Sequence, residues 1–266
     1  MSMRFWYQSM TNLGRLPNYK DSLQRHALRV CQEGVEVSVH GMSEAWFAEH
    51  MPTEMYRYAY AKHVIQNEVF GICRRAQAQG YDAVILGSFS EPFLGEIRSL
   101  LDIPVVGMAE SSMLLACSLA EQFSLIAIGT AQLVRLRHVI ERHGLGNRLR
   151  DIVPLEHPVH EKELDDAFRN PRAVIDEFTA AAKKAVDAGA DVVIAAEGVL
   201  NEVMFWNDVK SIDGATVLDA VGASLLYAEL MVNMKRKMGM GVGRRWAYAI
   251  PPADVLKVLD AGSAGF

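Results

Sequence analysis

The chain has 266 residues, enough for one large domain or two smaller ones. Half of the residues are hydrophobic and 22% are charged, which is typical of a globular protein with a sizeable core. The formal net charge of −5 argues against a nucleic-acid-binding surface, so we expect no nucleic acid partner.

Three cysteines, Cys31, Cys73 and Cys117, lie in predicted helices without CxxC spacing. We therefore expect no metal and a reducing compartment, the cytoplasm. The N-terminus has no basic region followed by a long apolar run, and no apolar stretch reaches about 18 residues. These patterns predict neither a signal peptide nor contact with a membrane.

Strands and helices are predicted to alternate along the first part of the chain, which indicates βαβ units and a parallel sheet. In chain order we expect a strand over 4–9, a helix over 19–33, strands over 35–40, 82–87 and 104–107, and a helix over 110–120.

The same pattern then repeats. In chain order we expect a strand over 124–130, a helix over 131–143, strands over 153–157, 191–196 and 216–219, and helices over 220–237 and 253–259. We expect the long helix over 220–237 to return to the first half. The predicted domains are therefore residues 1–116 with 220–266, and residues 117–219.

Two nine-residue stretches, 80–88 and 189–197, align without a gap at an offset of 109 residues (189 − 80 = 109). Each reads as a helix tail, a turn at glycine and a buried parallel strand. In open α/β sheets, ligands bind beyond the carboxyl ends of the strands. The repeat therefore predicts one site built from the residues that end the two strands, Ser88 and Glu197.

Several motifs resemble the aspartate/glutamate/hydantoin racemase superfamily, and most of all its hydantoin racemase branch, over nearly the whole chain. They are WYQS at 6–9, LGSFSEP at 86–92, DIPVVG at 102–107, ADVVI at 190–194 and VLDAV at 217–221. The resemblance implies an α/β fold of two pseudo-symmetric four-stranded parallel-sheet domains, with the active site in the cleft between them.

The same resemblance implies a reaction without a cofactor. Members usually place a cysteine at the end of each third strand, and the two thiols move a proton on opposite faces of a carbon next to a carbonyl. This chain departs from that pattern, because Ser88 and Glu197 stand at the two positions.

A glutamate in a partly desolvated site can have a pKa near neutral pH, so Glu197 is the predicted acid/base. Ser88 is either a hydrogen-bond donor to a developing oxyanion or an activated nucleophile. A helix N-cap is the alternative for Ser88. The residues expected to bind substrate follow the strand ends or supply backbone N–H groups: Gln8, Ser9, Phe89, Ser90, Thr130, Gly198 and Val199.

The predicted function is proton transfer next to the carbonyl of a small molecule such as a hydantoin-like ring, a cyclic imide or a substituted carboxylate. The asymmetry of the pair also fits a lyase (decarboxylase) or a hydrolase that uses Glu197 as its base. A catalytically inactive small-molecule-binding protein is the second alternative. Aromatic residues over 46–60 indicate a subunit contact or a lid, and we expect a homo-oligomer.

Overall fold

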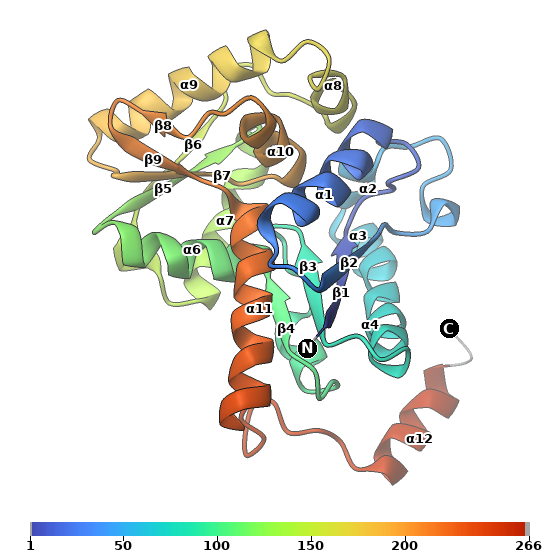
Figure 1. Cartoon of the computed structure of the whole chain (residues 1–266). Helices are drawn as coiled ribbons and strands as arrows, with labels where there is room; N and C mark the ends of the chain where they lie inside the picture. Colours follow the sequence, from blue (N-terminus) through green and yellow to red (C-terminus); the bar gives the residue numbers. More distant parts are fainter. Residues whose placement is uncertain (1, 264–266) are drawn as a thin grey trace.

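The computed structural model describes residues 2–263, apart from the side chains of residues 53, 260, 262 and 263. It contains two sheets that lie side by side (Figure 1). The first has the order β2 (Val35–His40), β1 (Met3–Ser9), β3 (Ala83–Gly87), β4 (Val105–Gly107), and all its strands are parallel.

The second sheet repeats this order with β6 (Leu149–Pro154), β5 (Phe123–Ala127), β7 (Val192–Ala195) and β9 (Ala215–Leu218), again parallel. The predicted α/β fold with two similar halves is confirmed. The sequence analysis did not predict β8 (Ser211–Ile212), a fifth strand that pairs antiparallel with β9 in a short hairpin.

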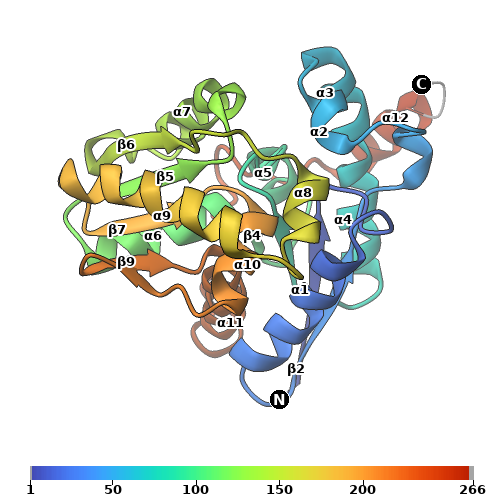
Figure 2. The ribbon, with the colours of Figure 1, turned by 90° about the horizontal axis from the view of Figure 1, so that it is seen from above.

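Helices cover both sheets and fill the space between them (Figures 1 and 2). The first half holds α1 (Pro17–Val30), α2 (Pro52–Tyr56), α3 (Ala59–Gln66), α4 (Glu68–Ala78), α5 (Leu94–Arg98) and α6 (Met108–Leu119). The remainder holds α7 (Leu133–Arg142), α8 (Glu161–Asp166), α9 (Arg172–Asp187), α10 (Gly198–Trp206), α11 (Ala220–Met238) and α12 (Ala253–Ser263). Short 3₁₀ helices, η1 (Glu44–Trp46), η2 (Thr130–Gln132) and η3 (Gly146–Arg148), complete the set.

The internal repeat is visible in the backbone. Gly80 and Gly189 both adopt positive φ, at +76° and +107°, where glycine avoids the penalty that a side chain would carry. The residue after each glycine donates a 3.1 Å hydrogen bond back into the preceding helix, from Tyr81 to Ala76 and from Ala190 to Ala185. Two equivalent helix endings therefore lead into the equivalent strands β3 and β7.

One large hydrophobic core spans both halves, and a smaller one lies on the outer face of the first sheet. Alternate residues of β1 divide between them, because Phe5 and Tyr7 enter the large core whereas Trp6 enters the smaller one under α4. Helix α11 leaves the second sheet and packs against β3, β4 and α6. The helix that follows the second sheet in the chain therefore packs on the first sheet.

One strand differs from its predicted position. The second strand of the second half is β6 at Leu149–Pro154, so the prediction of residues 153–157 was wrong by several residues. β6 is an edge strand whose Arg150 and Asp151 are exposed, so it lacks the apolar pattern that marks a buried strand. No helix among residues 2–263 is long and apolar enough to cross a membrane.

Candidate active site

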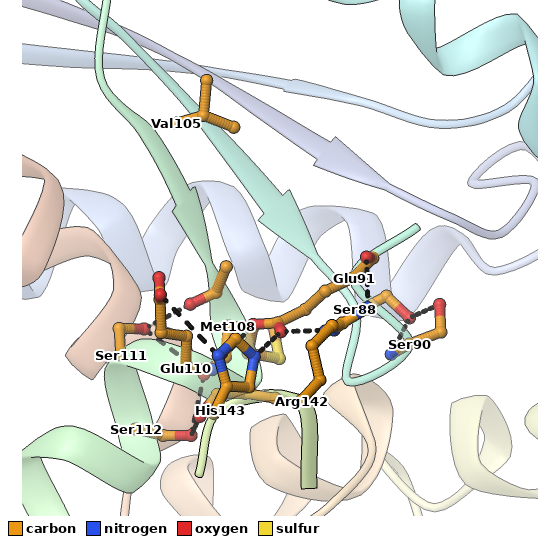
Figure 3. A network of polar contacts seen from close by, with 12 residues as sticks. Ser88, Ser90, Glu91, Val105, Met108, Glu110, Ser111, Ser112, Arg142 and His143 are labelled. Carbon is orange, nitrogen blue, oxygen red and sulfur yellow. Dashed lines mark hydrogen bonds and ion pairs between the residues drawn. The ribbon is translucent and has the colours of Figure 1, made fainter. Parts of the chain in front are cut away.

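Ser88 follows the last residue of β3 and forms a tight polar turn with Ser90. The Ser88 Oγ accepts a 3.2 Å hydrogen bond from the Ser90 N–H and lies 3.0 Å from the Ser90 Oγ (Figure 3). One of the two hydroxyl hydrogens joins the two oxygens, so the other hydroxyl hydrogen is available to a further acceptor. Ser88 does not cap α5, because the residue before that helix is Phe93.

The turn that carries Ser88 continues through two residues with left-handed backbones, Glu91 at φ +41° and Phe93 at φ +55°. Such conformations are costly for residues with a side chain and persist where surrounding contacts hold them. The Glu91 N–H donates to the Ser88 carbonyl over 3.2 Å. The position of Glu91 therefore helps to fix the conformation of the serine turn.

The Glu91 side chain is fully buried and is held from the second half of the chain (Figure 3). Its Oε2 accepts hydrogen bonds from Arg142 at 2.9 Å and His143 at 2.7 Å, at the end of α7. Its Oε1 accepts the backbone N–H of Glu110 at 2.7 Å. A Cβ at Gly107 would lie 2.1 Å from this Oε1, so glycine is required there. This network ties the serine turn to α7.

Glu197 follows β7 and is the N-cap residue of α10. Its backbone is extended, and its Oε2 accepts the Leu200 N–H at 2.7 Å. Burial raises the pKa of Glu197 to about 7, although the N–H groups of Leu200, Val199 and Gly198 and the charge of Arg135 lower it. Glu197 is thus a helix cap and also a carboxyl group that titrates near neutral pH.

Two buried tyrosines each pack on a glycine next to one of the two strand ends. The Tyr7 ring covers Gly87, where a Cβ would lie 2.4 Å from the ring, and the Tyr19 hydroxyl lies as close to a Cβ at Gly198. Burial raises the pKa of both tyrosines, and the charge of Glu197 raises it further. Glycine before Ser88 leaves room for the Tyr7 ring, and glycine after Glu197 leaves room for the Tyr19 hydroxyl.

Helix α8 fixes the position of Tyr19 from the other half. The buried Asp165 accepts the Tyr19 N–H at 2.8 Å and the Asn18 side-chain amide at 2.8 Å. Leu16, at the N-cap position of α1, offers no side-chain cap, so Asp165 supplies the missing acceptor. The first turn of α1 is therefore held by the second half of the chain.

A second buried polar cluster joins α1 to α10 and α11. His26 lies between the Glu202 Oε1 at 2.5 Å and the Asp219 Oδ2 at 2.9 Å, and its ring stacks on Phe205 at 3.6 Å. Burial lowers the pKa of His26, but hydrogen bonds to Asp219 and Glu202 outweigh it and raise the pKa to about 9. A protonated histidine between two carboxylates therefore links the two halves.

The predicted substrate-binding residues differ in their surroundings. Gln8 is fully buried and uses its amide inside the first half, accepting from Trp6 at 3.0 Å and donating to the Ser9 carbonyl at 2.9 Å. Phe89 and Ser9 are buried beside the serine turn, whereas Thr130 is exposed at the start of η2.

The N–H groups of Gly198 and Val199 point toward the Glu197 carboxylate rather than toward an open position. The expected oxyanion site at these two residues therefore competes with the cap that Glu197 already forms.

The three cysteines lie in or at the end of helices, away from both strand ends: Cys31 at the end of α1, Cys73 in α4 and Cys117 in α6. Burial raises the pKa of the Cys31 and Cys73 thiols to about 12. A thiol with such a pKa is a poor base at neutral pH. No group of three or more metal-ligating side chains comes together within the described part of the chain.

A family profile for Asp/Glu/hydantoin racemases matches residues 19–224, which is most of the chain. The chain belongs to this family. It is 28% identical over 165 residues to a hydantoin racemase of Pseudomonas sp. strain NS671, covering 62% of this chain and 64% of that protein. The matched region thus spans somewhat less than two thirds of that relative.

Solved structures of racemases have a similar fold. Allantoin racemase from Pseudomonas fluorescens superimposes with a TM-score of 0.75 at 19% identity, covering 94% of this chain and 97% of that chain. Allantoin racemase from Klebsiella pneumoniae gives 0.73 at 20% identity, covering 94% of each chain.

Sequence reasoning missed the groups that surround the predicted pair. Tyr7 lies in the quoted WYQS stretch but was not itself singled out, and no quoted motif contains Tyr19 or Arg135. Glu91 lies in a quoted motif, but its partners Arg142 and His143 are more than 50 residues away in the sequence. Only the three-dimensional arrangement reveals these contacts.

Proposed function

We propose that this chain is a cofactor-independent enzyme that moves a proton on a carbon next to a carbonyl group. Glu197 is the acid/base and Ser88 its partner. The observation that carries the proposal is a carboxyl group with a pKa of about 7 at the end of β7, the repeat equivalent of the serine turn. A base is most effective when its pKa is close to the working pH.

In the proposed reaction, the ionised Glu197 carboxylate removes the proton from the carbon, and the electron pair moves onto the carbonyl oxygen. A hydroxyl of the Ser88–Ser90 pair donates a hydrogen bond to that oxygen, because one hydroxyl hydrogen of the pair is not needed between them. The protonated Glu197 then returns the proton. The substrates proposed are a hydantoin-like ring, a cyclic imide or a substituted carboxylate.

The asymmetry of the pair also supports a directional reaction, either loss of carbon dioxide or hydrolysis with Glu197 as base. Glu197 also caps α10, and this structural role would keep the residue in place without catalysis. A catalytically inactive small-molecule-binding protein is therefore the remaining alternative. A cytoplasmic location and homo-oligomeric assembly stay predictions from the sequence.

The test is incorporation of solvent deuterium into 5-methylhydantoin, succinimide and phenylmalonate in D₂O, followed by NMR. Exchange without net loss of substrate supports the proposed proton transfer. Release of carbon dioxide indicates a lyase, ring opening indicates a hydrolase, and binding without turnover indicates the binding protein. Glu197→Gln should slow exchange by about 10²–10⁴-fold, because the amide oxygen can still cap Leu200 but cannot take up the proton. Glu141→Gln, at an exposed position of α7, is the matched control.

A further inference from the structure

Two cationic side chains near the predicted site belong to no ion pair at contact distance among the described residues. Arg135 comes from α7 in the second half and Lys62 from α3 in the first. Within the described residues, neither forms an ion pair or donates a side-chain hydrogen bond. Other partly buried arginines of this structure are paired, such as Arg98 with Glu110 and Arg142 with Glu91.

The surroundings of Arg135 locate its guanidinium group. Its charge acts on Glu197 at the end of β7 and on Lys62 of α3, and the charge of Glu161 on α8 acts on Arg135. These groups belong to both halves of the chain. The guanidinium group of Arg135 is therefore within electrostatic range of groups from both halves, the proposed acid/base Glu197 among them.

The Arg135 Nε is inaccessible to solvent and makes no hydrogen bond to any of the described residues. A buried donor of a charged group that lacks an acceptor is costly, and native proteins rarely leave one without a reason. Burial and the neighbouring charges of Arg135 and Arg142 lower the pKa of Lys62 to about 8, so its surroundings disfavour a second positive charge next to Arg135. Both observations favour the binding of an anion at Arg135 and Lys62.

We propose that Arg135 and Lys62 form an anion subsite that binds a carboxylate of the substrate next to Glu197. The inference rests on the proposed function and narrows its substrate class to carbonyl compounds that also carry a carboxylate. The planar guanidinium group suits a carboxylate because it can donate two parallel hydrogen bonds. Lys62 then supplies a second charge from the opposite half, so the bound anion bridges α3 and α7.

The test compares two probes that share one ring, hydantoin-5-acetate and 5-methylhydantoin, by isothermal titration calorimetry. We expect the anionic probe to bind the wild-type protein at least about tenfold more tightly, with an affinity that falls as sodium chloride is added. Arg135→Met and Lys62→Met keep much of the side-chain length and remove the charge. Each should lose most of the preference for the anion while binding 5-methylhydantoin as before. Arg137→Met, at an exposed position of the same helix, should change neither affinity.

Equal affinity of the wild-type protein for the two probes would overturn the subsite. If Arg135→Met lost affinity for both probes together, Arg135 would have a structural role and the subsite would be overturned. The subsite would also be overturned if the wild-type protein bound neither hydantoin-5-acetate nor the ring-free dicarboxylate malonate. The deuterium experiment separates this inference from the proposed function. Exchange into 5-methylhydantoin without a preference for the anion leaves the proposed function standing alone. Arg135-dependent anion binding without exchange leaves only the subsite.

Discussion

Glu197 combines two roles that pull its pKa in opposite directions. As the cap of α10 it accepts backbone N–H groups, which favour the ionised form. Burial favours the neutral form and has the larger effect, so the pKa rises to about 7. The two roles can be tested separately with a substitution that keeps the shape of the side chain and removes its charge.

Glu197→Gln should lower the rate of proton transfer by about 10²–10⁴-fold, the usual contribution of a positioned acid/base. The wild-type rate should rise with pH through an apparent pKa near 7, because the base acts in its ionised form, and the variant should lack this rise. Steady-state rates between pH 5 and 9 provide the measurement. Near-normal turnover of a variant with lowered stability would show that Glu197 only caps α10 and is not the acid/base.

Alkylation of the cysteines should leave the activity intact. Burial raises the pKa of Cys31 and Cys73 to about 12, and no cysteine lies at either strand end. The check is turnover after treatment of the native protein with iodoacetamide, with labelled sites identified by mass spectrometry. Complete inactivation by iodoacetamide, with substrate protecting one specific cysteine from labelling, would show that the active site is at that cysteine and not at the strand ends.

At the scale of elements, the segment between β3 and α5 depends on the buried Glu91. Its carboxylate links the serine turn to Arg142 and His143 at the end of α7, and its own backbone is left-handed. The conformation of the turn and the position of α7 are therefore coupled.

Glu91→Gln should reduce the free energy of unfolding by about 1–3 kcal/mol, because hydrogen bonds from charged donors to a buried carboxylate are weakened. Turnover should fall as well, since the serine turn loses one of its supports. Urea unfolding and steady-state kinetics measure the two effects, with Glu141→Gln as the exposed control on α7. Unchanged unfolding midpoints would show that the amide satisfies the network equally well.

Most of the elements could be predicted because hydrophobic runs and glycine turns are local signals. The strands β3 and β7 followed from the repeat, and the glycines before them have the positive φ that such turns require. The edge strand β6 was misplaced because its exposed residues lack an apolar pattern, and β8 is only two residues long. Ser88 and Glu197 could be predicted from the sequence because they end the two repeated strands. Arg135 and the partners of Glu91 could not, because they are distant in the sequence and approach only in the folded chain.

At the scale of the whole molecule, the cluster of His26, Glu202 and Asp219 joins the two halves through a buried positive charge. Because the pKa of His26 is raised from 6.5 to about 9, its stabilising effect is complete below pH 6.5 and is lost as the pH rises through 9. The junction between the halves should therefore weaken in alkaline solution.

His26→Gln should remove this pH dependence. The wild-type protein should lose stability relative to the variant between pH 6.5 and 9.5, which thermal unfolding across that range can measure. His138→Gln, at an exposed position of α7, is the control. Parallel curves for the wild-type protein and His26→Gln would mean that the histidine stays neutral between its two carboxylates.

The return of α11 to the first sheet has a consequence for the order in which the two halves can complete their packing during synthesis. The four strands of that sheet leave the ribosome early, yet the helix that packs on β3 and β4 is translated only after residue 219. The intervening segment, which contains the complete second sheet, has by then emerged. The part of the protein that is made first is therefore the last to be finished.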